Sequence, residues 1–213
     1  MGTLSTPRTD QLKIGRFIVS RWLGGGLQGK VFQALDPILD RQVAIKWLNP
    51  VGGNQTSRYR GTCPSEARIV AKLEHPNIVP LYEAGMYRGF PYLVFAYVDG
   101  TTLRAKWKQR GAMPVREALT LFRAILDGIA CAHAQGILHL DLSPGNIMID
   151  TAGVPRIMDF GLAKLAGVDA AGTDDNLIGT PKYMSPEHFN GRPLTARSDV
   201  FALGLILYEM VAG

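Results

Sequence analysis

The stretch His139-Leu140-Asp141-Leu142-Ser143-Pro144-Gly145-Asn146, followed later by Asp159-Phe160-Gly161, decides how the rest of the sequence is interpreted. It combines an aspartate, an asparagine five residues further on and a second aspartate in one short window. Phosphoryl transfer requires a carboxylate that orients the attacking hydroxyl, together with an amide and a carboxylate that hold Mg²⁺ on the phosphates. These residue types, in this order, predict a phosphoryl-transfer site.

The segment between the two motifs predicts a β-hairpin. Residues 147–150 and 154–158 are short apolar runs on either side of Thr151-Ala152-Gly153, a turn-like tripeptide. Because a hairpin returns the chain to its starting point, we expect Asn146 and Asp159 to lie close together in space.

A glycine-rich stretch near the N-terminus predicts a loop that approaches phosphates closely. Gly24, Gly26, Gly29 and Val31 fit the spacing G-x-G-x-x-G-x-V, and glycines leave room where a side chain would collide with a ligand. A dinucleotide-binding site has similar spacing but requires a helix directly after the glycines. Residues 30–35 read instead as a strand before the turn Asp36-Pro37, which favours a β-hairpin over the dinucleotide site.

One lysine stands among apolar residues in the predicted strand Gln42-Val43-Ala44-Ile45-Lys46-Trp47-Leu48. A surface lysine on an alternating strand would give the same pattern. Its position one hairpin after the glycines, however, matches the motif V-A-I-K. With H-x-D-x-x-x-x-N, D-F-G and the glycine pattern, the chain resembles the protein kinase family over residues 17–213.

The resemblance implies an α+β fold of two lobes. Residues 17–98 would form an N-lobe with a five-stranded antiparallel sheet and one helix, and residues 99–213 a mainly helical C-lobe. Residues 1–16, which are polar, are expected to form a flexible lead. The run Val98-Asp99-Gly100-Thr101-Thr102-Leu103 is similar to bacterial serine/threonine kinases of eukaryotic type.

Two C-lobe helices are also predicted from the residues themselves. From Pro114 to Gln135 apolar residues recur at helical spacing, and Gly136 ends the run. Residues 199–210 are apolar nearly all round, which predicts a helix in an interior. By resemblance this is the central C-lobe helix, and Asp199 holds the catalytic-loop backbone. The family continues with further helices, so we expect the chain to be a fragment of a longer protein.

The resemblance assigns catalytic roles to five residues. Lys46 would contact the α- and β-phosphates of ATP and pair with Glu66 on a helix that follows Pro64, with Glu74 as the competing partner. Asp141 would orient the acceptor hydroxyl, and Asn146 and Asp159 would bind Mg²⁺.

The resemblance also assigns a set of nucleotide-binding residues. Among them, Phe95 would be the gatekeeper, or simply a core residue, and Ala96 and Val98 would offer backbone hydrogen bonds to adenine. The full set is Leu23, Gly24, Gly26, Gly29, Val31, Ala44, Lys46, Phe95, Ala96, Val98 and Met148.

The segment after Asp159 resembles a kinase activation segment. Residues 168–176 predict a mobile loop, with Thr173 as a candidate phosphorylation site and Thr180 beside the acceptor site. Ser185-Pro186-Glu187 stands where the family has A-P-E. The family pairs that glutamate with an arginine that this chain does not contain.

The catalytic stretch departs from the family at two positions. Leu140 replaces an arginine that usually receives a phosphorylated loop, so we expect activity without loop phosphorylation. Ser143 replaces a lysine that neutralises charge on the transferring phosphoryl group. Loss of one such donor could lower the rate by about 10²–10³.

Composition narrows the remaining classes. The content of 46% apolar and 19% charged residues indicates a globular protein, and the net charge of +5 is scattered, which argues against a nucleic-acid partner. Cys63 and Cys131 are expected to be reduced thiols, and the four histidines show no zinc spacing. The sequence has neither a secretory signal nor a membrane span, so a cytoplasmic location is expected for this part of the protein.

The sequence therefore predicts a serine/threonine protein kinase that uses ATP and Mg²⁺ and acts on a protein hydroxyl. Two alternatives stay open at this point. A pseudokinase or ATP-binding scaffold would follow if Ser143 abolishes transfer. A small-molecule phosphotransferase shares H-x-D-x-x-x-x-N, but the segment from Asp159 to Glu187, which shapes a peptide site, argues against it.

Overall fold

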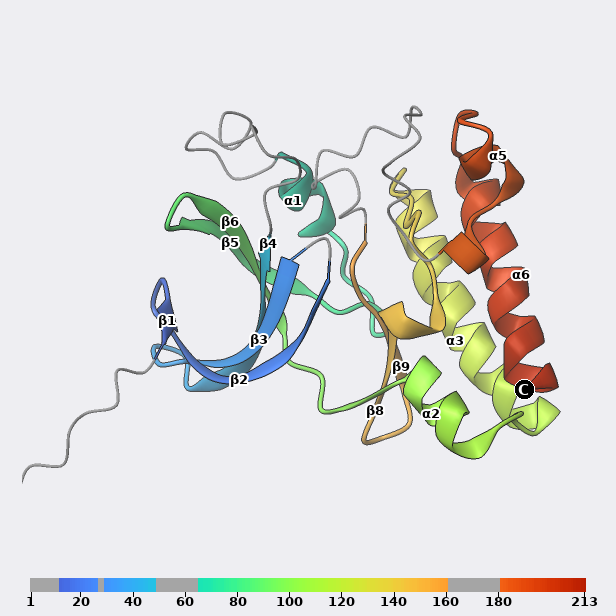
Figure 1. Cartoon of the computed structure of the whole chain (residues 1–213), viewed down its shortest axis with the longest axis horizontal. Coiled ribbons are helices and arrows are strands. Elements are labelled where there is room, and N and C mark those ends of the chain that lie inside the picture. Colours follow the sequence, from blue (N-terminus) through green and yellow to red (C-terminus); the bar gives the residue numbers. More distant parts are fainter. Residues whose placement is uncertain (1–11, 27–28, 49–64, 161–180) are drawn as a thin grey trace, which may run out of the picture.

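The computed structural model describes residues 12–26, 29–48, 65–160 and 181–213, without the side chains of residues 65, 66 and 69. In these residues a mainly β lobe lies beside a mainly helical lobe (Figure 1). The predicted two-lobed α+β fold is confirmed. No helix in the described ranges is long and apolar enough to cross a membrane.

The N-lobe contains an antiparallel sheet of six strands. In spatial order these are β1 (Lys13–Ile14), β2 (Phe17–Gly26), β3 (Gly29–Asp36), β4 (Arg41–Leu48), β6 (Phe90–Ala96) and β5 (Leu81–Tyr87). The five predicted strands are present, and β1 adds a sixth. Arg88 and Gly89, with φ of 51° and 82°, make the turn between β5 and β6, as tight hairpins require.

The predicted flexible lead over residues 1–16 is wrong for its last residues. Lys13 and Ile14 pair with Ile18 and Phe17, and the Ile14 side chain is fully buried beside Phe17. Burial of one isoleucine offsets the entropy of ordering so short a strand.

Helix α1 (Ser65–Val70) is the helix predicted after Pro64, but it is shorter than expected. The prediction extended it to just before His75. Beyond Val70 the chain continues as a turn, in which the Leu73 amide donates to the Val70 carbonyl at 3.0 Å. Leu73 is nevertheless buried, as the apolar face of the prediction required.

The C-lobe begins with a strand where only a connector was predicted. β7 (Gly100–Thr102) pairs with β8 (Ile147–Asp150), which pairs with β9 (Pro155–Ile157). The hairpin β8–β9 confirms the pattern in residues 147–158. Its partner β7 could not be inferred, because that pairing joins residues far apart in the sequence.

The rest of the described C-lobe is made of helices and short 3-10 turns. They are α2 (Leu103–Arg110), α3 (Val115–Ala134), η2 (Pro144–Asn146), η3 (Pro181–Tyr183), α5 (Pro186–Phe189) and α6 (Ala196–Ala212). The helix predicted over residues 114–135 is confirmed, and its apolar positions Ala118, Ile125 and Ile129 are buried. Val115, Leu119 and Leu126, which share the same apolar pattern, are exposed.

Helix α6 differs from its prediction. Ala202, Leu203, Ile206 and Met210 form a buried face, whereas Val200 and Tyr208 have exposed fractions of 59% and 67%. An interior position was therefore wrong for half of the helix. Its apolar content does not decide burial, because none of the described elements covers that second face.

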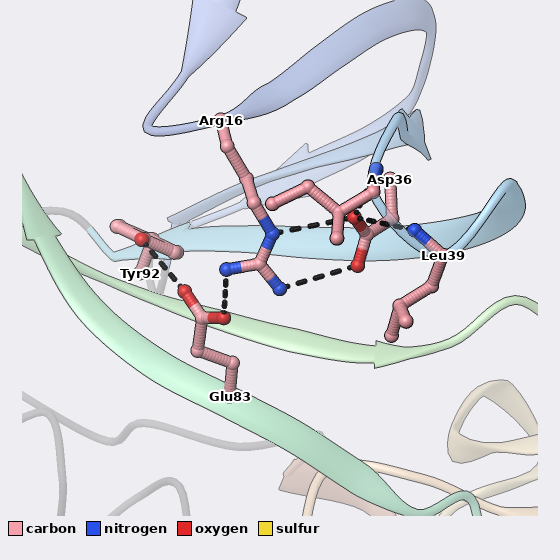
Figure 2. A network of polar contacts seen from close by, with 6 residues as sticks. Arg16, Asp36, Leu39, Glu83 and Tyr92 are labelled. Carbon is pink, nitrogen blue, oxygen red and sulfur yellow. Dashed lines mark hydrogen bonds and ion pairs between the residues drawn. The ribbon is translucent and has the colours of Figure 1, made fainter.

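A polar network connects the strands of the N-lobe (Figure 2). Arg16, between β1 and β2, donates to both carboxylate oxygens of Asp36 at 3.2 Å and also pairs with Glu83 of β5. The Tyr92 hydroxyl donates to Glu83 at 3.1 Å. The Arg16 hydrogen bonds hold the pKa of Asp36 below its ordinary value of 3.8, although burial opposes them. This network joins β3, β5 and β6 through the side chains of Asp36, Glu83 and Tyr92.

Candidate active site

A cleft of about 940 Å³ lies between the two lobes. Asp141, Asn146 and Asp159 line it together with Lys46. All the predicted nucleotide-binding residues also line it, namely Leu23, Gly24, Gly26, Gly29, Val31, Ala44, Lys46, Phe95, Ala96, Val98 and Met148. The fold thus brings together residues that span most of the described sequence.

The backbone at the start of the catalytic loop is held by Asp199 of α6. Its two carboxylate oxygens accept the amides of His139 at 2.9 Å and Leu140 at 2.8 Å. His133 of α3 contacts the same carboxylate at 2.7 Å. Leu140 has a φ of 62°, which is unfavourable for a leucine and is sustained here by the buried carboxylate. The part expected of Asp199 is visible in these contacts.

His139 connects the catalytic loop to the segment that carries Asp159. Its Nε2 donates to the Met158 carbonyl at 3.0 Å, and its Nδ1 accepts the Asp141 amide at 3.3 Å. The ring also packs on Phe160, with the ring centroids 4.7 Å apart. One buried imidazole therefore sets the distance between the two aspartates.

The Asn146 side chain is oriented by Asp141. Its Nδ2 donates to the Asp141 carbonyl at 2.7 Å and to Asp141 Oδ2 at 3.2 Å. The amide oxygen is then the atom that Asn146 can offer to a cation. The Met158 amide donates to the Asn146 carbonyl at 3.0 Å, so the hairpin does return Asp159 toward Asn146 as predicted.

Lys46 of β4 contacts Asp159 across the cleft. Its Nζ lies 2.9 Å from Asp159 Oδ2, and the lysine side chain is nearly buried. Asp159 itself has a φ of 68°, a conformation that L residues seldom adopt. The partner predicted for Lys46 is Glu66, which belongs to α1. The Glu66 side chain lies outside the described ones, so that pairing stays a prediction.

The three glycines of the predicted phosphate loop differ in their surroundings. A Cβ at Gly29 would lie 2.2 Å from the Trp47 carbonyl oxygen, so packing against β4 excludes any side chain. At Gly24 and Gly26, by contrast, a Cβ would meet no protein atom within 4 Å. Contacts in the described protein thus explain Gly29, whereas room for a ligand would explain the other two.

Apolar side chains and backbone groups form the inner wall of the cleft. Phe95 is buried in the main core and also lines the cleft, so its two interpretations are compatible. The Ala96 amide donates to the Pro80 carbonyl at 3.1 Å. A contact from Ala96 to a base would therefore use its carbonyl group.

Residues missed by the sequence analysis also line the cleft. They include Arg21, Val79, Tyr97, Thr101, Thr102 and Arg104. Arg104 is the one most able to take part in the chemistry, because it is charged and extends from the first turn of α2 to near Gly145 of the catalytic loop. No sequence motif indicates it, since a basic residue in an exposed-looking helix is common.

A second charged cluster joins η3 to α6. The Tyr183 hydroxyl donates to Glu209 Oε2 of α6 at 2.6 Å, and Lys182 pairs with Oε1 of the same carboxylate. Burial, followed by the bond to Glu209, raises the pKa of Tyr183, and Arg104 acts in the opposite direction. This phenol therefore stays neutral between a carboxylate and a guanidinium.

Glu187 has a local partner in the described chain. The Ser198 hydroxyl of α6 donates to Glu187 Oε1 at 2.6 Å and holds the pKa of Glu187 below its ordinary range. Gly161, Thr173 and Thr180, which belong to the predicted activation segment, lie outside the described residues.

Comparisons with known proteins agree with this geometry. A family model described as protein kinase domain matches residues 17–213. The chain is 37% identical over 202 residues to the serine/threonine-protein kinase PrkC of Bacillus subtilis, covering 93% of the chain and 31% of that protein. It is 36% identical over 225 residues to the probable serine/threonine-protein kinase PknB of Bifidobacterium longum, covering 99% of the chain and 32% of that protein.

Among solved structures, the kinase domain of PknI from Mycobacterium tuberculosis superposes with a TM-score of 0.74 at 24% identity, covering 95% of this chain and 77% of that one. That likeness concerns the fold alone. The chain spans about a third of the length of these two curated relatives. Because the family model matches nearly the whole sequence, the chain belongs to the protein kinase domain family.

Proposed function

We propose that the protein transfers the γ-phosphate of ATP to a serine or threonine hydroxyl of a protein substrate. The observation that carries the proposal is the convergence of Asp141, Asn146, Asp159 and Lys46 on one cleft, with the catalytic-loop backbone held by a buried Asp199. The relatives from Bacillus subtilis and Bifidobacterium longum are named as serine/threonine-protein kinases, which supports the same substrate class.

Each residue has a distinct part in this reaction. Asp141 accepts the proton of the attacking hydroxyl while a new bond forms between that oxygen and the γ-phosphorus. The bond from this phosphorus to the bridging oxygen breaks, and ADP leaves. Lys46 neutralises phosphate charge, and Phe95, Val31 and Ala44 exclude water from the base.

Magnesium fits the donor atoms of this cleft. Mg²⁺ binds through one or two oxygen ligands of the protein together with substrate phosphates. Asp159 supplies a carboxylate. The Asn146 amide oxygen is available, because the Asn146 Nδ2 group already donates its hydrogen bonds to Asp141. When bound, the ion neutralises charge on the phosphates; the two residues would position it there.

The alternative of an ATP-binding scaffold rests on Ser143. This side chain is short, neutral and only 2% exposed, in a loop that otherwise carries the transfer machinery. Binding of ATP without transfer would favour that alternative.

The test is Mg²⁺-dependent transfer of labelled γ-phosphate by the purified protein to itself and to a generic protein substrate. Asp141→Asn should lower the rate by about 10²–10⁴, the usual contribution of a positioned base. Asp127→Asn, which changes an exposed carboxylate of α3, is the matched control and should transfer as the wild type does. Equal rates for the wild type and Asp141→Asn would refute the proposal.

A further inference from the structure

The catalytic loop lacks a positive charge where transfer needs one. Charge on the transferring phosphoryl oxygens must be stabilised by cations or donors placed in advance beside the reacting groups. Between Asp141 and Asn146 the loop has only neutral residues, and Ser143 is buried. A cation at this point therefore has to come from another element.

Arg104 of α2 reaches this point. The Thr102 hydroxyl caps α2 by accepting the Ala105 amide at 3.1 Å, and Thr102 pairs with Met148 of β8. These contacts fix the first turn of α2 next to the catalytic loop. Arg104 consequently lines the same cleft as Asp141 and Asn146.

The guanidinium of Arg104 and the hydroxyl of Ser143 both lie near Gly145 of the catalytic loop. A Cβ built at Gly145 would be 3.5 Å from Arg104 Cζ and 3.5 Å from Ser143 Oγ. Both groups thus contact one small volume, which is open because residue 145 is a glycine. A Cβ there would make ordinary van der Waals contact with both groups.

The charge of Arg104 is not neutralised by a carboxylate in the described chain. The ion pairs among those residues use other cations, namely Arg16, Lys46, Lys106, His133, Arg156 and Lys182. Arg104 lies near the Tyr183 hydroxyl and opposes the rise in its pKa, while that hydroxyl donates to Glu209. A neutral phenol near the guanidinium does not cancel its charge.

The other cleft cations have different positions. Lys46 contacts Asp159 at 2.9 Å from the N-lobe side. Arg21 comes from β2 and donates to the Tyr97 hydroxyl at 3.2 Å. Among the described cleft residues, Arg104 is the cation on the Ser143 side of Asp141.

We propose that Arg104 supplies, from α2, the positive charge on the transferring phosphoryl group that the catalytic loop lacks at Ser143. The inference rests on the proposed function. A guanidinium suits the task, because its planar donors can bind two phosphoryl oxygens at once and it stays charged at all working pH values.

The experiment compares Arg104→Gln with the wild type in the transfer assay, measuring kcat, both KM values and nucleotide affinity. Arg104→Gln should lower kcat by about 10²–10³, the effect of one lost charge-stabilising donor, with nucleotide Kd changed by less than about threefold. Lys108→Gln, an exposed cation of the same helix, is the matched control and should be unchanged.

A rescue variant separates lost charge from lost structure. In Arg104→Gln, the second change Ser143→Lys returns a cation to the same volume and should recover at least about tenfold of the lost kcat. Thermal unfolding of each variant identifies any that do not fold, in which case Arg104→Lys replaces Arg104→Gln and should keep part of the rate.

Three results would overturn the assignment. One is a kcat of Arg104→Gln near that of the wild type. Another is a raised KM for the protein substrate at unchanged kcat, which would make Arg104 a substrate-binding residue. The third is no recovery with Ser143→Lys in a folded protein. Should the wild type itself not exceed Asp141→Asn, the proposed function fails first, and the assignment with it.

Discussion

Asp36 in the N-lobe and Asp199 in the C-lobe have nearly the same set of contacts and different consequences. Both carboxylates are inaccessible to solvent, with exposed fractions of 0% and 1%. Each accepts two backbone amides and contacts one basic side chain. For Asp36 these are Ile38, Leu39 and Arg16, and for Asp199 they are His139, Leu140 and His133.

The difference lies in the sequence distance over which each carboxylate acts. Asp36 bonds the amides two and three residues ahead, which is a local turn of the kind that Asp-Pro predicts. Asp199 bonds amides 60 and 59 residues away and holds Leu140 in a left-handed conformation. The same chemistry therefore stabilises a turn in one lobe and positions catalytic groups in the other.

The largest effect is expected from Asp199→Ala. The change leaves the buried amides of His139 and Leu140 without an acceptor, which should lower the free energy of unfolding by about 2–5 kcal/mol and abolish transfer. Urea denaturation and the transfer assay measure the two effects. Asp199→Asn, which keeps one acceptor oxygen, should lose less, and Asp127→Ala should lose nothing. A fully active Asp199→Ala protein would show that the loop does not need this carboxylate.

An intermediate effect is expected from Tyr183→Phe. It removes the donor to Glu209 Oε2 and leaves that buried carboxylate with Lys182, at a cost of about 1–3 kcal/mol. Tyr208→Phe is the matched control, because Tyr208 lies on the exposed face of α6, the helix that carries Glu209. If both variants unfold at the same urea concentration, the Tyr183 hydrogen bond contributes nothing to stability.

The smallest effect is expected from Asp36→Asn. Arg16 is partly exposed, so solvent screens its interaction with the carboxylate, and the loss of stability should be smaller than for Asp199→Ala. Nucleotide affinity should not change, since none of these residues lines the cleft. Asp40→Asn, at an exposed turn residue with a φ of 46°, is the control.

The pH dependence of this variant sharpens the comparison. The folded-state pKa of Asp36 is lowered below 3.8, chiefly by Arg16, so its contribution is present above pH 3.8 and is lost as the pH falls through the folded value. The stability gap between the wild type and Asp36→Asn should therefore close below pH 3.8. A gap that persists well below that pH would mean that the charge of Asp36 is not what stabilises the turn.

The sequence by itself determined the features that depend on neighbours along the chain. Short-range geometry accounts for the spacing from Asp141 to Asn146, the β8–β9 hairpin and the period of α3, because each depends on residues that are close in the sequence. The kinase resemblance then indicated the cleft residues and the part played by Asp199. Their chemical roles remain proposals.

Only the tertiary structure decided which distant residues meet. Arg104 and Ser143 both lie near Gly145, β1 completes the sheet through Ile14, and one face of α6 is exposed, although none of these has a spacing signature in the sequence. The physical reason is that packing and electrostatics act through space, whereas motifs record neighbours along the chain. A missing charge at Ser143 is visible in the sequence, but the guanidinium beside it is visible only in the fold.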